Sequence, residues 1–152
     1  MARSTVEQLI ERFGLQPLPV EGTLYASTHA AEAGTAMIGL YSAEPLSRSY
    51  FHRLTHDEVW HHYEGAPLEL LVADAGFTTV ARHRLGPCAA DTRPVHVVAA
   101  NDWQAARSTG EFTLVGCTVA PGFVFDDFTM LSDMPALADT ARRQQPQFAA
   151  FV

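Results

Sequence analysis

Short apolar or alternating runs, separated by turn residues, recur along most of this chain and constrain its fold more than any other feature. The runs are residues 36–41, 50–54, 58–63, 68–73, 78–85, 95–100, 104–107 and 112–119. Turn residues fall between them at intervals of about 8–12 residues, which is typical of β-sandwiches and closed β-barrels. No long helical pattern intervenes, so parallel βαβ winding is disfavoured. The sequence therefore predicts an all-β region from about residue 23 to about residue 130.

A short amphipathic helix is expected before this region, at about residues 4–13. Ser4 and Glu7 have the spacing of a capping box, and Gly14 stands where the helix would end. The apolar side chains that would share one helical face are Val6, Leu9, Ile10 and Phe13.

A second short helix is expected after the β region, at about residues 133–144. Ser132 or Asp133 can cap it, Pro135 suits its first turn, and Arg142 and Arg143 suit its C-terminus. No composition shift or linker interrupts the pattern between the helices. Residues 1–152 are therefore expected to form one domain.

Composition limits the partners. The chain has 17 acidic residues against 10 basic ones, a formal charge of −7 that repels phosphate backbones and anionic lipid surfaces. We therefore expect a small-molecule partner and neither nucleic acid nor membrane. Cys88 and Cys117 have no CxxC spacing, and there is neither a signal-peptide pattern nor an apolar run of membrane-spanning length. These features favour a cytoplasmic location.

Four motifs carry a resemblance to a known family. They are residues 20–25 (VEGTLY), 52–61 (HRLTHDEVWH), 102–106 (DWQAA) and 115–128 (VGCTVAPGFVFDDF). Together they resemble the cupin superfamily, and more narrowly the cupin-5 group, a domain of unknown function, over roughly residues 5–145. This resemblance implies a double-stranded β-helix, that is, a jelly-roll barrel, usually paired into a homodimer. It implies no single reaction.

The general cupin pattern places two His and one Glu on a first hairpin and a third His on a later one. On this chain those positions fall on His52, Leu54, Glu58 and Gln104. Leu cannot coordinate a metal, and a neutral amide is a poorer ligand than imidazole for transition metals. A bound metal is therefore not favoured. If iron, manganese, nickel or zinc were present, it would be held by His52, Glu58 and Gln104.

The same residues can instead form a metal-free polar cluster in a pocket. Side chains alternate along a strand, so Trp60 and His62 would share the inward face with Glu58. A carboxylate beside His52 would hold the imidazole in one tautomer, as a general base requires. We expect His52 to be the base, Glu58 its orienting carboxylate and Gln104 a donor to a developing oxyanion. A purely structural pairing of His52 with Glu58 or Arg53 is the alternative.

Further residues are candidates for the pocket wall, because aromatic faces beside a few polar groups bind small ligands. Trp60 and Trp103 offer such faces, although barrel core is as good an interpretation for Trp103. The remaining candidates are His62, Tyr25, Tyr41, Glu21 and Thr28, the last two mainly from the resemblance.

Two other features are given structural roles. Cys117 lies in an apolar run without an adjacent base, which indicates an inert buried thiol. Phe123, Phe125 and Phe128 are expected to cap the barrel or a dimer interface.

The function that fits these residues best is proton-transfer chemistry without metal or cofactor, on a small carbonyl, sugar or secondary-metabolite substrate. Isomerisation, epimerisation, cyclisation and dehydration belong to this class. One alternative is a metal-dependent dioxygenase or decarboxylase. Another is a non-catalytic module that binds a metabolite without changing it.

Overall fold

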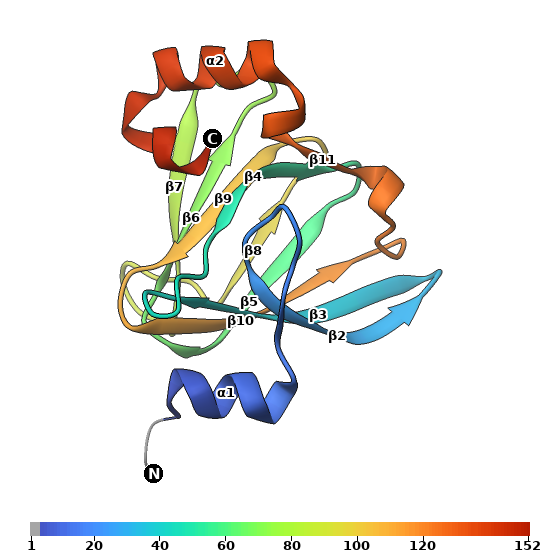
Figure 1. Cartoon of the computed structure of the whole chain (residues 1–152), viewed down its shortest axis with the longest axis vertical. Helices are drawn as coiled ribbons and strands as arrows, with labels where there is room; N and C mark the ends of the chain where they lie inside the picture. Colours follow the sequence, from blue (N-terminus) through green and yellow to red (C-terminus); the bar gives the residue numbers. More distant parts are fainter. Residues whose placement is uncertain (1–3) are drawn as a thin grey trace.

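Two antiparallel sheets make up the body of the computed structural model, which describes residues 4–152 (Figure 1). The six-stranded sheet has the order β1-β2-β3-β10-β5-β8, and the five-stranded sheet the order β11-β4-β9-β6-β7. The strands are β1 (Gln16–Pro17), β2 (Leu24–Ala31), β3 (Gly34–Ser42), β4 (Ser49–Leu54), β5 (Glu58–Gly65), β6 (Leu68–Ala73), β7 (Val80–Leu85), β8 (Val95–Val98), β9 (Trp103–Ser108), β10 (Phe112–Val119) and β11 (Phe128–Met130).

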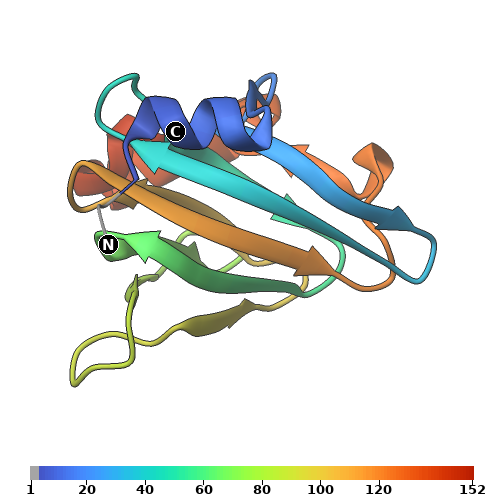
Figure 2. The ribbon, with the colours of Figure 1, turned by 90° about the horizontal axis from the view of Figure 1, so that it is seen from below.

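The predicted all-β, jelly-roll class is confirmed by this arrangement, because neighbours within each sheet are mostly distant in sequence. The sheets face each other and are not closed into one continuous barrel, so the expected closure is replaced by a sandwich. Figure 2 shows the outer face of the six-stranded sheet, with α1 (Val6–Phe13) in front of it. Most strand positions follow the apolar runs, whereas β7 begins later and β8 ends earlier than those runs.

The N-terminal helix, α1 (Val6–Phe13), is capped by a different residue from the one predicted. Thr5 is the N-cap, and its hydroxyl accepts from the Gln8 backbone N–H at 3.3 Å. In return, the side-chain oxygen of Gln8 accepts from the Thr5 backbone N–H at 3.0 Å. This is a capping box shifted by one residue. Ser4 instead contacts the Glu64 carboxylate, and Gly14 ends the helix at φ 61°.

The C-terminal segment contains α2 (Pro135–Gln144) between short 3-10 turns at Phe125–Asp127, Leu131–Asp133 and Pro146–Phe151. Pro135 occupies the first helical turn as expected. The N-cap is Met134, which makes no side-chain capping bond, so the predicted cap at Ser132 or Asp133 is wrong. Among the described residues, neither helix has the length and apolar character needed to cross a bilayer.

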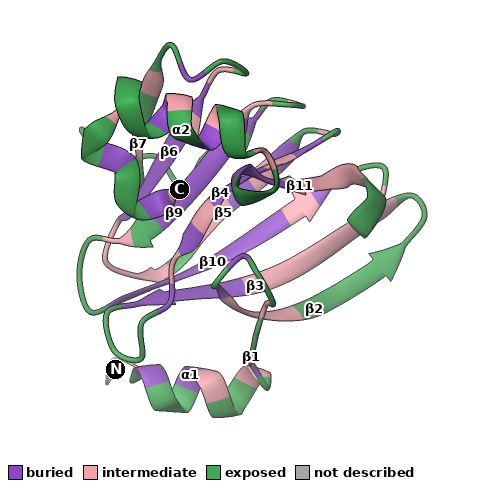
Figure 3. Cartoon of the chain, turned by 45° about the horizontal axis from the view of Figure 1, so that its top comes forward, coloured by how far each residue is buried: buried purple, intermediate pink, exposed green. Residues whose placement is uncertain are grey.

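The apolar core has three parts. The helix α1 packs on the outer face of β3 and β10, while α2 and the last 3-10 turn cover the outer face of the five-stranded sheet. Between the sheets lies a cluster that includes Tyr41, Trp60, Leu70 and Val115. Figure 3 shows the buried strand centres and the exposed outer sides of both helices. Burial on both faces fixes strand register, since a slip of one residue would exchange them.

Alternation along β4 and β9 decides which side chains reach the space between the sheets. Phe51 and Trp103 pack in the cluster under α2. Their neighbours His52 and Gln104, which are paired across the two strands, point the opposite way. The inner face of the five-stranded sheet therefore presents an imidazole beside an amide.

Candidate functional site

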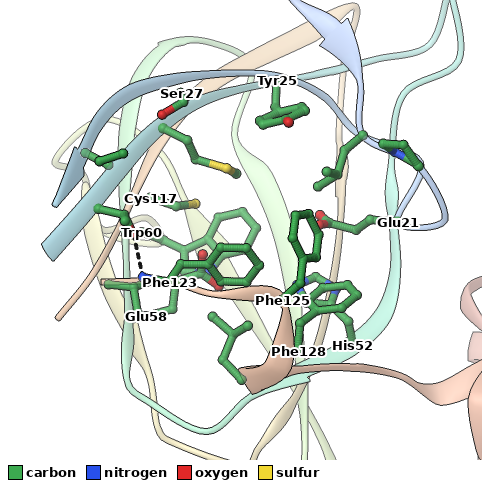
Figure 4. Close-up of a pocket in the computed structure, with 18 residues that line it drawn as sticks. Glu21, Tyr25, Ser27, His52, Glu58, Trp60, Cys117, Phe123, Phe125 and Phe128 are labelled. Atoms are coloured by element: carbon green, nitrogen blue, oxygen red, sulfur yellow. Dashed lines mark hydrogen bonds between the residues drawn. The ribbon is translucent and has the colours of Figure 1, made fainter. Parts of the chain in front are cut away.

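A cavity of about 230 Å³ opens at one end of the sandwich, between the two sheets (Figure 4). Its wall is formed by residues of β2, β3, β4, β5, β10 and β11 and of the loops before β2 and after β10. The lining residues are Leu18, Pro19, Glu21, Tyr25, Ser27, Ala30, Thr35, Ala36, Met37, His52, Leu54, Glu58, Trp60, Cys117, Val119, Phe123, Phe125 and Phe128. A largely apolar wall with a few polar groups is typical of a small-molecule site.

Glu58 is a carboxyl group of this wall with a strongly raised pKa. Glu58 is the first residue of β5, and only 7% of it is exposed. Burial raises the pKa of Glu58 from 4.5 to about 7, against the opposing effect of His52, while the charge of Glu21 raises it further. A hydrogen bond from Gln104 works in the other direction. Glu58 therefore exchanges its proton close to neutral pH, as a general acid or base requires.

Gln104 lies behind Glu58 and does not line the cavity. Its Nε2 donates to Glu58 Oε2 at 2.5 Å, and its Oε1 accepts from the Trp60 indole nitrogen at 2.8 Å. Only 1% of Gln104 is exposed. Because both ends of the amide are engaged, Gln104 orients Glu58 and Trp60 from the opposite sheet. This corrects the expected position of Gln104 as a donor facing a substrate oxyanion.

The His52 imidazole is oriented by the backbone. Its Nδ1 lies 2.8 Å from the carbonyl oxygen of Tyr50, so Nδ1 donates to the backbone and Nε2 is left for other partners. The ring also stacks on Phe128 with centroids 5.3 Å apart. In Figure 4, His52 lies towards one side of the cavity with Glu21, and Glu58 lies towards the other. The tautomer is thus fixed by Tyr50, and not by Glu58 as expected.

Two more of the predicted wall residues are in place. Tyr25 and Glu21 both line the cavity. Glu21 comes from the loop before β2, which is tied to β4 by a hydrogen bond from the Tyr50 amide to the Glu21 carbonyl at 3.0 Å. Its carboxylate accepts from the Thr23 hydroxyl at 3.0 Å. A second carboxylate therefore faces the same space as Glu58.

The remaining predicted wall residues lie outside the lining. Trp103 packs on the outer face of β9 under α2, with its ring centroid 5.8 Å from that of Phe77. Strand alternation places it on the face opposite to Gln104. His62 shares the face of Glu58 and Trp60 but lies beyond Trp60 along β5, with Nε2 3.4 Å from the Ala66 carbonyl. Their expected contact with a ligand in this cavity is therefore not supported by their positions.

Tyr41 and Thr28 are also displaced from the wall. Tyr41 is fully buried beside Trp60, with ring centroids 6.0 Å apart, and burial raises the pKa of its hydroxyl. Thr28 is exposed at an irregularity in the pairing of β2 with β3. Tyr25 and Ser27 line the cavity, so alternation along β2 already turns Thr28 to the opposite face.

Three Phe residues that were expected to cap the barrel or a dimer interface form an aromatic cluster, the Phe cluster, on the cavity wall. Phe123, Phe125 and Phe128 line the cavity, with ring centroids 5.2–6.3 Å apart and nearly perpendicular planes. Their spacing in the 115–128 motif indicates aromatic packing but not the direction of the rings. Cys117 also lines the wall, and burial raises the pKa of its thiol, as suits an inert thiol.

The donor set does not fit the metal that the general cupin pattern implies. Leu54 occupies the second His position and lines the cavity, while the Gln104 oxygen is taken by the Trp60 indole. Within residues 4–152, no group of three His, Cys, Asp or Glu side chains is arranged to hold a metal ion. No step through a metal is therefore derived for these residues.

The two-sheet jelly roll and the cavity between its sheets define a cupin. The chain belongs to the Cupin_5 family, described as Cupin superfamily (DUF985), whose model matches residues 7–131. Protein SO0799 from Shewanella oneidensis has a similar crystal structure, with a TM-score of 0.81, 27% identity, and coverage of 97% of this chain and 94% of that one. A hypothetical protein from Leishmania major has a TM-score of 0.79, 24% identity, and coverage of 98% and 97%.

More distant structures share the fold alone. An oxalate decarboxylase from Lactobacillus farciminis is 11% identical with a TM-score of 0.59, over 88% of this chain and 39% of that one. No curated protein matches the sequence. Fold similarity at this level does not transfer a reaction, since one fold hosts many chemistries.

Proposed function

We propose that this chain is an enzyme of the isomerase, epimerase or lyase type that moves a proton on a small metabolite bound in the cavity. The observation that carries the proposal is Glu58, a buried carboxylate on the cavity wall whose pKa is raised to about 7. Clefts that hold a titratable group with a strongly shifted pKa are frequently active sites.

In this proposal Glu58 takes a proton from a carbon atom of the substrate next to a carbonyl group, and later returns it. The Gln104 bond fixes the direction of the carboxylate, which saves the cost of orienting it during the reaction. His52 presents Nε2 from another part of the wall and can accept a second proton or a substrate hydroxyl hydrogen. The apolar wall limits water around Glu58 and so maintains its raised pKa.

Deuterium uptake tests this proposal without knowledge of the substrate. The purified protein is incubated with a small-metabolite extract in D₂O, and mass spectrometry records which compounds gain deuterium at carbon. Wild-type protein is expected to label at least one compound that Glu58→Gln protein leaves unlabelled. A matched control is Glu64→Gln, because Glu64 lies on the same strand, outside the cavity lining.

The absence of Glu58-dependent labelling across the extract would count against catalysis. Stabilisation of the protein by a compound that it does not label would then favour the non-catalytic binding module.

A further inference from the structure

We infer that the cavity selects small organic cations, molecules that carry an ammonium group next to an apolar body. This inference deepens the proposed function, because it names the charge class of the substrate for the same cavity. It rests on the charge of the wall, its hydrogen-bonding character and its aromatic content, which are separate observations.

The charged groups of the wall favour a positive ligand. Two carboxyl groups, those of Glu21 and Glu58, face the cavity, and among residues 4–152 no Arg or Lys lines it. Arg53, next to His52 in sequence, lies 4.8 Å over the Trp103 ring on the outer face of the sheet. An anionic ligand would therefore meet the Glu21 carboxylate and, above about pH 7, that of Glu58, without a guanidinium to neutralise it, which is unfavourable in a low-dielectric space.

Hydrogen bonding on the wall also favours a donor-bearing ligand. Glu21 presents carboxylate oxygens, and the Tyr50 bond engages only Nδ1 of His52. The Thr35 hydroxyl oxygen already accepts from the Phe123 amide at 3.0 Å. An ammonium group supplies N–H donors and no acceptor, so it matches this set.

Aromatic rings surround the same space. Tyr25, Trp60, Phe123, Phe125 and Phe128 all line the cavity, and Figure 4 shows the Phe cluster opposite the Tyr25 ring. A cation within about 6 Å of a ring centroid is attracted by the π face, and sites of several rings recognise quaternary ammonium groups. The rings also suit the apolar part of the ligand, whose size is limited by a cavity of about 230 Å³.

Three probes of similar size test the inference by isothermal titration calorimetry: benzylammonium, benzyl alcohol and benzoate. We expect the cation to bind at least about tenfold more tightly than the alcohol, since several cation–π contacts and a carboxylate exceed 1.4 kcal/mol together. Benzoate is expected to bind most weakly. Benzylammonium keeps its proton around neutral pH, so any pH dependence of binding there belongs to the protein.

Variants separate charge from shape. Glu21→Gln and Glu58→Gln should each weaken cation binding about fivefold to tenfold while changing the binding of benzyl alcohol by less than about twofold. Phe125→Ala is a further variant with low risk to folding, because Phe125 is 65% exposed, and it should also weaken cation binding. Glu64→Gln serves as the control and should leave all three probes unchanged.

The inference would be overturned if benzyl alcohol or benzoate bound as tightly as the cation, or if the cation did not bind at millimolar concentration. Cation binding that both Glu variants left unchanged would overturn it as well. Deuterium labelling of an uncharged or anionic metabolite that depends on Glu58 would leave the proposed function standing and remove only this inference.

Discussion

Replacing Glu58 by Gln is expected to lower the rate of the proton-transfer reaction between about 100-fold and 10,000-fold, the usual contribution of a positioned general acid or base. The amide has nearly the same shape and can still contact Gln104, but it cannot take up a proton. In the wild type, kcat/KM should rise with pH and level off above a midpoint at about 7, because the ionised carboxylate is the active form. Initial rates across pH 5–9 measure both effects.

The comparison requires that Glu58→Gln protein be folded, which circular dichroism establishes. Glu64→Gln is the control for a charge change on the same strand, and its rate should equal that of the wild type. A Glu58→Gln rate within threefold of the wild type would remove Glu58 from the reaction. A rate profile that was flat between pH 5 and pH 9 would do the same.

The second large effect concerns stability. Between pH 4.5 and about 7 the folded protein keeps a proton on Glu58 that the unfolded chain has released, since burial raises the pKa only in the folded state. The free energy of unfolding should therefore fall with rising pH over this range, by about 3 kcal/mol from this one group at 1.36 kcal/mol per unit. Below pH 4.5 Glu58 is protonated in both the folded and the unfolded chain, so it no longer lowers the free energy of unfolding.

Urea unfolding at pH 4.5 and pH 8 isolates this contribution when the wild type is compared with Glu58→Gln. Other carboxyl groups add slopes of their own, but those slopes are common to both proteins. The variant should gain stability relative to the wild type by about 3 kcal/mol as the pH rises. An equal pH dependence of the two proteins would mean that the carboxyl group is solvated and has an ordinary pKa.

Much of the fold could be predicted from the chain because β-strands leave a local pattern. The apolar runs around β3 to β6 and β10 coincide with strands to within a few residues. A closed barrel was expected, but the two sheets stay separate. The sequence does not decide between these outcomes, since hydrogen bonding between strand edges depends on the packing of the two sheets. Capping was misplaced by one residue because Ser4 and Thr5 both offer a hydroxyl three residues before a Glu or Gln.

Strand alternation applies to the motif at residues 102–106 as it does to the hairpin at residues 52–61. Trp103 and Gln104 are neighbours on a strand, so they cannot both face one cavity. The expected position of Gln104 on the inner face requires Trp103 to lie under α2, as it does. The two positions were therefore predictable as mutually exclusive.

Other parts of the site carry no local signal. The orientation of His52 depends on the Tyr50 carbonyl. The raised pKa of Glu58 results from burial by residues distant in sequence, which only the assembled sheets bring together. The Phe cluster was recognised as a packing group, but its contact with the cavity depends on the path of the loop after β10. Pairing into a homodimer stays a prediction.

Titration of the Glu58 carboxyl carbon by ¹³C nuclear magnetic resonance tests most directly whether this cavity holds a proton-transfer group. The Glu58→Gln spectrum assigns the resonance, because only that signal disappears. We expect a midpoint near 7, set by burial and by the charge of Glu21 against the effects of His52 and Gln104. A midpoint near 4.5 would show that Glu58 is an ordinary ionised carboxylate at neutral pH and would contradict the proposed role.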